Sequence, residues 1–244
     1  MRNERIVGII ILSVTVLGIL LPAIIPAPRI DLSSIWFKEG FLKKLIEVNM
    51  STVYEKSFSK EDIPSPYTLT VSVSSGTLEI KPLKDTEDVL KIVIKGKGSG
   101  YDVNVGEEGV SVSASNSLVE LYVNEEYLKE LRVNLQSSMG DIELDKIHYN
   151  LDISIQSSTS RLELNYVSEA VSKISVMSSF VSGEISYPKS TGVQLKVIAD
   201  SSYVTLSGDA SVSITSGTET YGSGGVSLEI AADSSFVSMR VTEK

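Results

Sequence analysis

From residue 69 onward, apolar and polar residues alternate along the chain in short runs. In residues 131–144, Val133, Leu135, Ile142 and Leu144 fall on one side of an extended chain, and polar residues fall on the other. A period of two predicts β-strands with one buried face and one solvated face. Each run is interrupted by paired serines or by glycines, which predicts a turn between two short strands.

The alternating runs recur. Six of them share the pattern, with breaks that begin at Ser74, Ser137, Ser157, Ser178, Ser201 and Ser234. The middle four breaks are 20, 21 and 23 residues apart. Residues 92–105 and 110–123 provide two degenerate copies, and residues 208–225 predict an insertion or an irregular hairpin.

Repeats of about 21 residues predict an all-β domain over residues 69–244, in which stacked units bury an interior that no unit could bury alone. We favour a β-solenoid, like a parallel β-helix, with one repeat per rung. An antiparallel stack of hairpins or a β-sandwich fits the alternation almost as well, because periodicity does not reveal strand direction.

Before the repeats lies an apolar segment. Residues 6–25 carry no charge and, at about 1.5 Å per residue, are long enough to span a bilayer core of about 30 Å. Arg2 and Arg5 precede this segment. The positive-inside rule then places the N-terminus in the cytoplasm and the rest of the chain outside it, in a single-pass arrangement. We therefore expect residues 1–30 to be a membrane anchor that contacts lipid, with a cleaved signal peptide as the alternative.

Residues 31–68 connect the anchor to the repeats. Residues 33–48 show near-helical spacing of apolar residues, so we expect an amphipathic helix that rests on the membrane surface or packs against the β domain. The side chains expected at a membrane interface are Trp36, Phe37, Phe41, Lys43 and Lys44. Asn49 begins an Asn-Met-Ser glycosylation sequon, and residues 52–68, with Pro64 and Pro66, resemble a linker.

Charge and composition exclude some classes of chemistry and argue against one class of partner. The net charge is −9, and cysteine is absent, which excludes disulfides and thiol chemistry. Residues 1–68 hold 8 Lys/Arg and 7 Asp/Glu, whereas residues 69–244 hold 14 and 24, so the acidity belongs to the β domain. This balance argues against a nucleic-acid partner, because phosphate binding needs clustered basic residues.

The repeats carry a family resemblance. The stretch SSMGDIELDKIHYNLDISIQSSTSRLEL, within residues 137–164, resembles the DUF4097 family, also called toastrack domains, and the related head domains of adhesins. The resemblance covers most of residues 69–244. It implies an extracytoplasmic, often membrane-tethered β-solenoid, and it supplies no catalytic residues. Later copies replace Gly-Asp after the serines with an aromatic residue or with Ser/Thr.

Candidate chemistry is sparse. His148 is the single histidine and is expected to be a turn or surface residue, which leaves a Ser-His-Asp triad with one candidate base. Asp141, Glu143 and Asp145 alternate on one strand face, and with Asp152 and Glu163 beside them they suggest calcium ligands or, preferably, a solvated acidic face. We expect no catalytic residue, no cofactor and no resident metal.

Aromatic residues follow the serines in three copies, at Phe180, Tyr203 and Phe236. In register they would form a ladder. If the ladder faces inward, which we favour, its rings belong to the core. If it faces outward, it forms a surface suited to protein or glycan contact.

These features predict a non-enzymatic, membrane-anchored protein of the cell envelope that presents a β-solenoid for adhesion, assembly or protein and glycan interaction. One alternative is an accessory or sensor subunit of an envelope-stress or membrane complex. A lesser alternative is a polysaccharide-active enzyme built on a β-helix.

Overall fold

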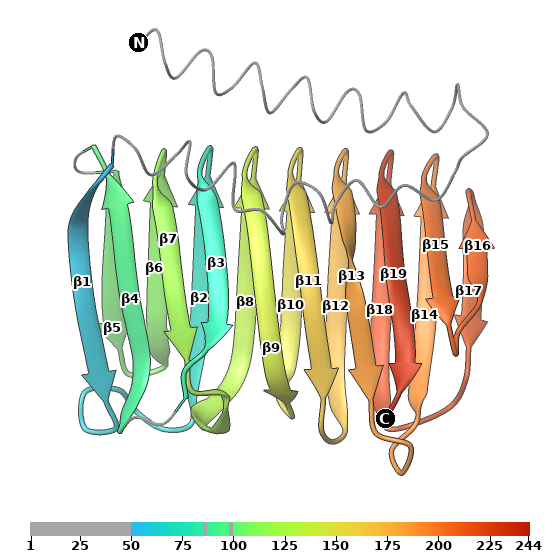
Figure 1. Cartoon of the computed structure of the whole chain (residues 1–244), viewed down its shortest axis with the longest axis horizontal. Helices are drawn as coiled ribbons and strands as arrows, with labels where there is room; N and C mark the ends of the chain where they lie inside the picture. The colour runs from blue at the N-terminus through green and yellow to red at the C-terminus, as the bar shows by residue number, and fades with distance from the viewer. Residues whose placement is uncertain (1–49, 85–86, 98–99) are drawn as a thin grey trace, which may run out of the picture.

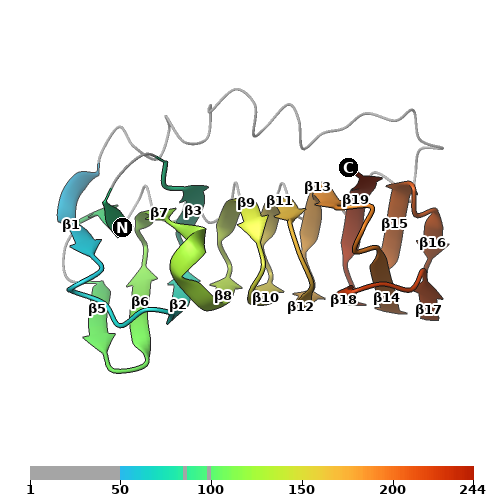
Figure 2. The same cartoon turned by 90° about the horizontal axis from the view of Figure 1, so that it is seen from below.

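The computed structural model describes residues 50–84, 87–97 and 100–244. These residues form an all-β structure, as the alternation predicts, in which two mixed sheets lie face to face (Figure 1, Figure 2). Within the described residues, the one helical element is a short 3-10 turn, η1 (Glu125–Tyr127).

Sheet A has ten strands. In spatial order they are β1 (Ser51–Ser59), β4 (Asp88–Gly96), β7 (Leu118–Val123), β3 (Thr77–Pro82), β9 (Met139–Ile147), β11 (Thr159–Tyr166), β13 (Phe180–Tyr187), β19 (Phe236–Glu243), β15 (Tyr203–Gly208) and β16 (Val212–Ile214). Sheet B has nine strands: β17 (Gly217–Tyr221), β14 (Val193–Asp200), β18 (Val226–Asp233), β12 (Ala170–Met177), β10 (Asn150–Gln156), β8 (Leu128–Gln136), β2 (Tyr67–Ser74), β6 (Gly109–Ser115) and β5 (Tyr101–Gly106).

Each repeat forms an arch that rises in sheet B and returns in sheet A. The arches are β2–β3, β6–β7, β8–β9, β10–β11, β12–β13, β14–β15 and β18–β19. Neighbouring arches pair in parallel and in register, so that Ile153 lies between Val133 and Ile174. The turns between paired strands therefore line up along one edge of the stack (Figure 1).

Spatial order departs from chain order at both ends of the stack. Arch β6–β7 lies outside β2–β3, and arch β18–β19 lies between β12–β13 and β14–β15. A solenoid that advances one rung per repeat would keep chain order throughout. The irregular copy at residues 92–105 and the segment 208–225 supply antiparallel strands at or next to the ends of the sheets instead, namely β4, β5, β16 and β17. The degenerate copy expected at residues 92–105 is therefore present as two strands around a break, but it runs from sheet A to sheet B, opposite to the arches, and pairs antiparallel.

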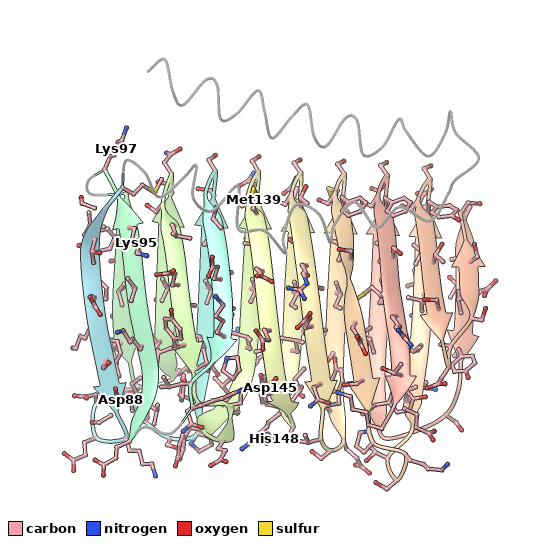
Figure 3. The ribbon with its side chains drawn as sticks, in the orientation of Figure 1. Asp88, Lys95, Lys97, Met139, Asp145 and His148 are labelled. Carbon is pink, nitrogen blue, oxygen red and sulfur yellow. The ribbon has the colours of Figure 1, made fainter. Side chains whose placement is uncertain are left out.

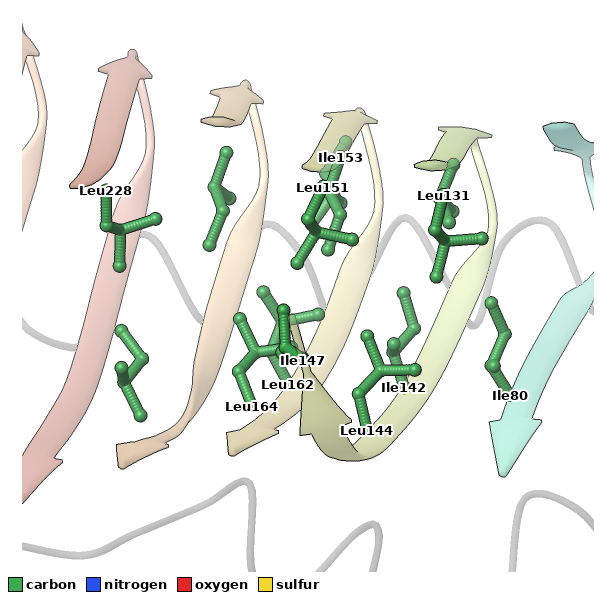
Figure 4. Packing of buried hydrophobic residues seen from close by; sticks show 14 of the residues in the cluster. Ile80, Leu131, Ile142, Leu144, Ile147, Leu151, Ile153, Leu162, Leu164 and Leu228 are labelled. Carbon is green, nitrogen blue, oxygen red and sulfur yellow. The ribbon is translucent and has the colours of Figure 1, made fainter. Parts of the chain in front are cut away.

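The core lies between the sheets. Leu131, Leu151 and Leu228 of sheet B face Ile142 and Leu162 of sheet A, and all five are at most 2 % exposed (Figure 4). The cluster runs the length of the stack from Phe58 to Ile214. Burial of this apolar surface is the main force that holds the two layers together, at about 25 cal/mol for each Å² removed from water.

In the five arches from β8–β9 onward, the two serines of each turn have different roles. The first serine adopts a left-handed conformation, with φ of 50° at Ser137 and at Ser157, and Asn116 takes the same role in arch β6–β7 with φ of 52°. The second serine is buried, and its hydroxyl donates to the carbonyl two residues earlier, as Ser158 does to Gln156 at 2.7 Å. Buried backbone groups need partners, and here the serine side chains provide them.

Residues 52–68 differ from expectation, because they are part of the domain and do not form a linker. Strand β1 (Ser51–Ser59) pairs with β4 at the edge of sheet A, and the first arch already begins at Tyr67. Phe58 and Ile63 are 1 % and 2 % exposed. Phe58 and Ile63 pack into the end of the core, and this burial holds the segment in the domain although the composition around Pro64 and Pro66 resembles that of a linker.

The expected anchor lies outside the described residues, as do residues 33–48. Within the described part of the chain, no helix is long and apolar enough to cross a membrane.

Candidate interaction surfaces

An aromatic ladder lies on the outer face of sheet A. Phe180, Phe236 and Tyr203 occupy equivalent positions on the adjacent strands β13, β19 and β15. The rings of Phe180 and Phe236 are stacked with centroids 5.1 Å apart, and those of Tyr203 and Phe236 lie 5.3 Å apart. Stacked pairs of this kind contribute about 0.5–1.5 kcal/mol beyond burial.

The ladder points outward, so the preferred expectation that it belongs to the core is wrong. The residue after each aromatic faces the interior, and Val181, Val237 and Val204 are fully buried. Tyr203, at the end of the ladder, is 45 % exposed, and Phe180 and Phe236 are half-buried. Sheet A therefore presents a row of aromatic edges at the turn end of the strands.

The same row continues along the sheet with smaller side chains. Thr159 and Met139 precede Phe180 in register, and Met139 lies near the turns (Figure 3). Both are half-exposed. The aromatic ladder therefore continues as a row of partly exposed side chains along the turn end of sheet A.

Below this row lies the acidic face predicted on β9. Asp141, Glu143 and Asp145 all point outward, and Asp145 lies far from Met139 toward the other end of the strands (Figure 3). Arg161 of β11 lies among them, 3.7 Å from Asp141 and in contact with Glu163. Burial raises the pKa of the Asp141 carboxyl, against the opposing effect of Arg161.

The calcium ligands suggested by the sequence also included Asp152, but Asp152 lies on the opposite face, in sheet B. In the ranges 50–84, 87–97 and 100–244, no three histidine or carboxylate side chains are arranged to hold a metal ion. Glu163 pairs in register with Glu143, as the stacking predicts. Partial neutralisation by Arg161 is consistent with a solvated, ion-paired acidic face.

The outer face of sheet B carries a row of alternating charge. Across five neighbouring strands the row reads Arg132, Asp152, Lys173, Glu229 and Lys196. Lys196 donates to Glu229 at 2.8 Å, and this hydrogen bond lowers the pKa of the Glu229 carboxyl. Alternation brings each charge beside opposite ones, which stabilises parallel pairing and leaves little net charge on this face.

Above that row, small side chains leave a shallow hollow. Ser154, Ser175, Ala231, Met177 and Asp233 are among the residues that line it. A second shallow hollow lies over β1, β4 and β7 in sheet A, lined by Lys91, Lys95 and Glu120 among others. Both are open surface features, unlike the deep apolar pockets that usually hold small ligands.

His148 lies in the turn after β9, at the end of the strands away from the serine turns (Figure 3). It is exposed, its Nδ1 is 2.8 Å from the carbonyl oxygen of Lys146, and its ring meets Tyr149 edge-on. This is the turn position expected from the sequence.

One functional-looking group escaped sequence analysis. Glu125 is 4 % exposed and accepts hydrogen bonds from the amides of Asp145 and Lys146 and from the Tyr149 hydroxyl, at 2.7, 3.1 and 2.9 Å. Burial raises the pKa of the Glu125 carboxyl despite these three donors. Because its partners lie about 20 residues away, no local motif reveals it, and its geometry is that of a clamp between η1 and β9.

The side chains expected at a membrane interface, Trp36, Phe37, Phe41, Lys43 and Lys44, lie outside the described residues, as does the sequon residue Asn49.

Comparisons with known proteins bear on the fold. No family model and no curated protein matches the sequence. The chain is similar to the crystal structure of a "putative cell adhesion protein" from Clostridium sporogenes, with a TM-score of 0.51 and 13% identity over 80% of this chain and 100% of that one. A "putative adhesin" from Bacteroides fragilis matches at a TM-score of 0.36 and 9% identity, over 80% and 98% of the two chains. The first similarity shows a shared fold. The second is too weak to support a conclusion about the fold.

Proposed function

We propose that this chain is a non-enzymatic, membrane-anchored protein of the cell envelope that presents its arch stack, a variant β-solenoid, for adhesion or assembly. The observation that carries the proposal is the aromatic ladder of Phe180, Phe236 and Tyr203 on the outer face of sheet A. Exposed, preorganised aromatics supply contact area at little cost in side-chain entropy, which suits protein and glycan partners.

Three further considerations support the proposal. The described surface offers broad faces with shallow hollows, which favours extended contacts over a small-molecule site. The neighbour from Clostridium sporogenes is named for cell adhesion, and the repeats resemble toastrack and adhesin head domains. The apolar segment at residues 6–25 is long enough to anchor such a domain at a membrane.

The test uses cells that display the full chain. Adherence to surfaces coated with envelope polysaccharide or with envelope protein is compared between the native chain and Tyr203→Ser with Phe180→Ser. Both side chains lie on the outer face, so we expect the fold to survive and adherence to fall about tenfold, as for the loss of central aromatic contacts. Lys173→Ser on sheet B is the matched control and should leave adherence unchanged.

Equal adherence of the ladder variant and the control would contradict the ladder as the binding surface. Protection of residues 69–244 from a protease added outside the cell would contradict the topology. Co-purification of a membrane protein that depends on residues 1–48, with no adherence at all, would favour the accessory-subunit alternative.

A further inference from the structure

The outer face of sheet B has a charge balance unlike that of the domain that carries it. Residues 69–244 hold 14 Lys/Arg and 24 Asp/Glu. The charge row across five strands of this face, in contrast, holds three basic and two acidic side chains, in the order Arg132, Asp152, Lys173, Glu229 and Lys196. Two copies of an acidic domain repel each other least where such faces meet.

The charges of this row are only partly paired within the chain. Lys196 and Glu229 form an ion pair of 2.8 Å inside the row, and Arg132 forms one within its own strand. Among the residues that the structure describes, neither Asp152 nor Lys173 forms an ion pair, and both side chains are exposed. The middle of the row therefore presents one acidic and one basic group that a second surface could pair.

We propose that this face binds a second copy of the chain, sheet B against sheet B, about a two-fold axis that runs along the strands between β12 and β18. This rotation sets β12 opposite β18 of the partner subunit and β10 opposite its β14. Lys173 then faces Glu229 of the partner subunit. Asp152 faces the partner's Lys196. Each contact occurs twice by symmetry, as in any isologous interface.

The order of charges selects this axis over the other in-plane one. Rotation about an axis along the row would place Lys173 opposite the partner's Lys173, and each other charge opposite its own equivalent, which is repulsive. The chosen axis also keeps Met50 of both copies at the same end of the dimer, as two chains anchored in one membrane require. The Lys196–Glu229 bond does not prevent the new pairs, because an ammonium has three donors and a carboxylate has several acceptor sites.

The side chains around the row suit such a contact. Val171 and Met177, on either side of the row in β12, are 62 % and 47 % exposed. Both would lie opposite β18 of the partner subunit, so docking removes them from water. The hollow beside the row, lined in part by Ser154, Ser175 and Ala231, gives the longer lysine and glutamate side chains room to lean along the strands.

The size of the face is that of a specific interface. Six strands, from β8 to β17, take part. At about 4.8 Å apart and about 26 Å long, they cover about 750 Å² on each copy. A standard interface buries about 800 Å² per partner. The outer faces of sheet A, with their aromatic ladders, then point away from each other on the two sides of the dimer (Figure 2).

Capture between two differently tagged full chains in detergent micelles tests the proposal. An acidic variant carries Lys173→Glu with Lys196→Glu, and a basic variant carries Asp152→Lys with Glu229→Lys. Each variant sets like charges opposite one another, so we expect its self-capture to fall about tenfold below the native level. When the two variants are mixed, every facing pair is opposite in sign again. Capture of one variant by the other should therefore return to the native level.

The matched control is Lys146→Glu with Lys189→Glu. It makes the same change in net charge as the acidic variant, but both residues lie outside the outer face of sheet B. Self-capture of the control should equal that of the native chain. Native self-capture that is absent, or variant self-capture as strong as the control's, would overturn the proposal, and so would a mixture that does not recover.

Salt provides a second measurement that needs no substitution. Charge pairs at the rim of an interface are screened, so native self-capture should fall several-fold between about 0.1 M and about 1 M sodium chloride. An unchanged value would contradict the charge row as the contact. Adherence is measured on cells that carry many copies each, so it does not require pairing. Loss of pairing with adherence retained, or the reverse, therefore separates this proposal from the proposed function.

Discussion

The backbone N–H of Ser138 donates a hydrogen bond of 3.0 Å to the hydroxyl oxygen of Ser158, the equivalent serine of the next arch. The same contact links Ser158 to Ser179 and continues through Ser235 to Ser202. We call these five residues the serine ladder. Its order is that of the arches in space, and Ser235 precedes Ser202 although it follows it in sequence.

Removal of one rung of the serine ladder should be costly. Ser158→Ala leaves the buried N–H of Ser138 without an acceptor and takes a donor from the Gln156 carbonyl. An unsatisfied buried donor costs about 1–3 kcal/mol, so we expect a loss of that size in the free energy of unfolding by urea. The adjacent exposed Ser157→Ala is the control and should change it by less than about 0.5 kcal/mol. Equal effects of the two substitutions would mean that the serine ladder contributes nothing specific.

The left-handed residue that precedes each ladder serine makes a separate prediction. Ser157 has φ of 50°, a conformation that costs most L-residues about 1–2 kcal/mol and that asparagine tolerates better. Asn116 already fills the equivalent position in another arch. Ser157→Asn should therefore raise unfolding stability by up to about 1 kcal/mol, and β-branched Ser157→Val should lower it by about 1–2 kcal/mol. Denaturant titration of both variants measures the free energy of unfolding. A valine variant as stable as the native chain would contradict the prediction.

These turns show how far the sequence could predict the structure. The alternation of apolar and polar residues around Val133 and Ile142 identifies the strands and their buried faces. Only one orientation of such a strand places all of its apolar side chains in the core. The alternation could not predict that arch β18–β19 lies between arches β12–β13 and β14–β15. Ile230 packs in register with both Ile174 and Val197, and the repeats are too similar for local sequence to prefer one order.

The aromatic ladder illustrates a second limit. Phe180 and Val181 are both apolar, and only the exact length of the turn decides which of them faces inward. Strand β1 was missed for a different reason: the prolines at 64 and 66 resemble a linker, whereas the long-range insertion of Phe58 into the core makes the preceding residues a strand.

A close approach of two strands makes Gly183 intolerant of substitution. Its φ is 155°, and an added Cβ would lie within the van der Waals radius of the Leu162 carbonyl oxygen, a backbone atom of the neighbouring strand β11. Gly183→Ala should thus force the two strands apart and cost more than about 3 kcal/mol of unfolding stability. Gly106→Ala is the control, because nothing lies within 4 Å of its added Cβ. A melting temperature for Gly183→Ala close to that of the control would show that β11 and β13 yield easily.

The buried carboxylate of Glu125 makes stability depend on pH in a defined direction. Burial raises its folded-state pKa above the unfolded value, so the folded protein holds more protons in the interval between the two. Its contribution to stability is therefore fully present below the unfolded pKa and is lost as the pH rises through the folded pKa.

Glu125→Gln removes this titration but places an amide donor against the donors from Lys146 and Tyr149. In acid the native carboxyl is protonated and also carries a donor, so we expect a loss of at most about 1 kcal/mol there and a difference from the native chain that narrows as the pH rises. Urea unfolding from about pH 4 to about pH 8 measures this difference, because the interval begins near the ordinary glutamate pKa. The control is Glu126→Gln, which removes one exposed ion pair with Lys146 and should cost at most about 1 kcal/mol. A difference for Glu125→Gln that widens with rising pH would reverse the sign and show that the three donors outweigh the cost of burial.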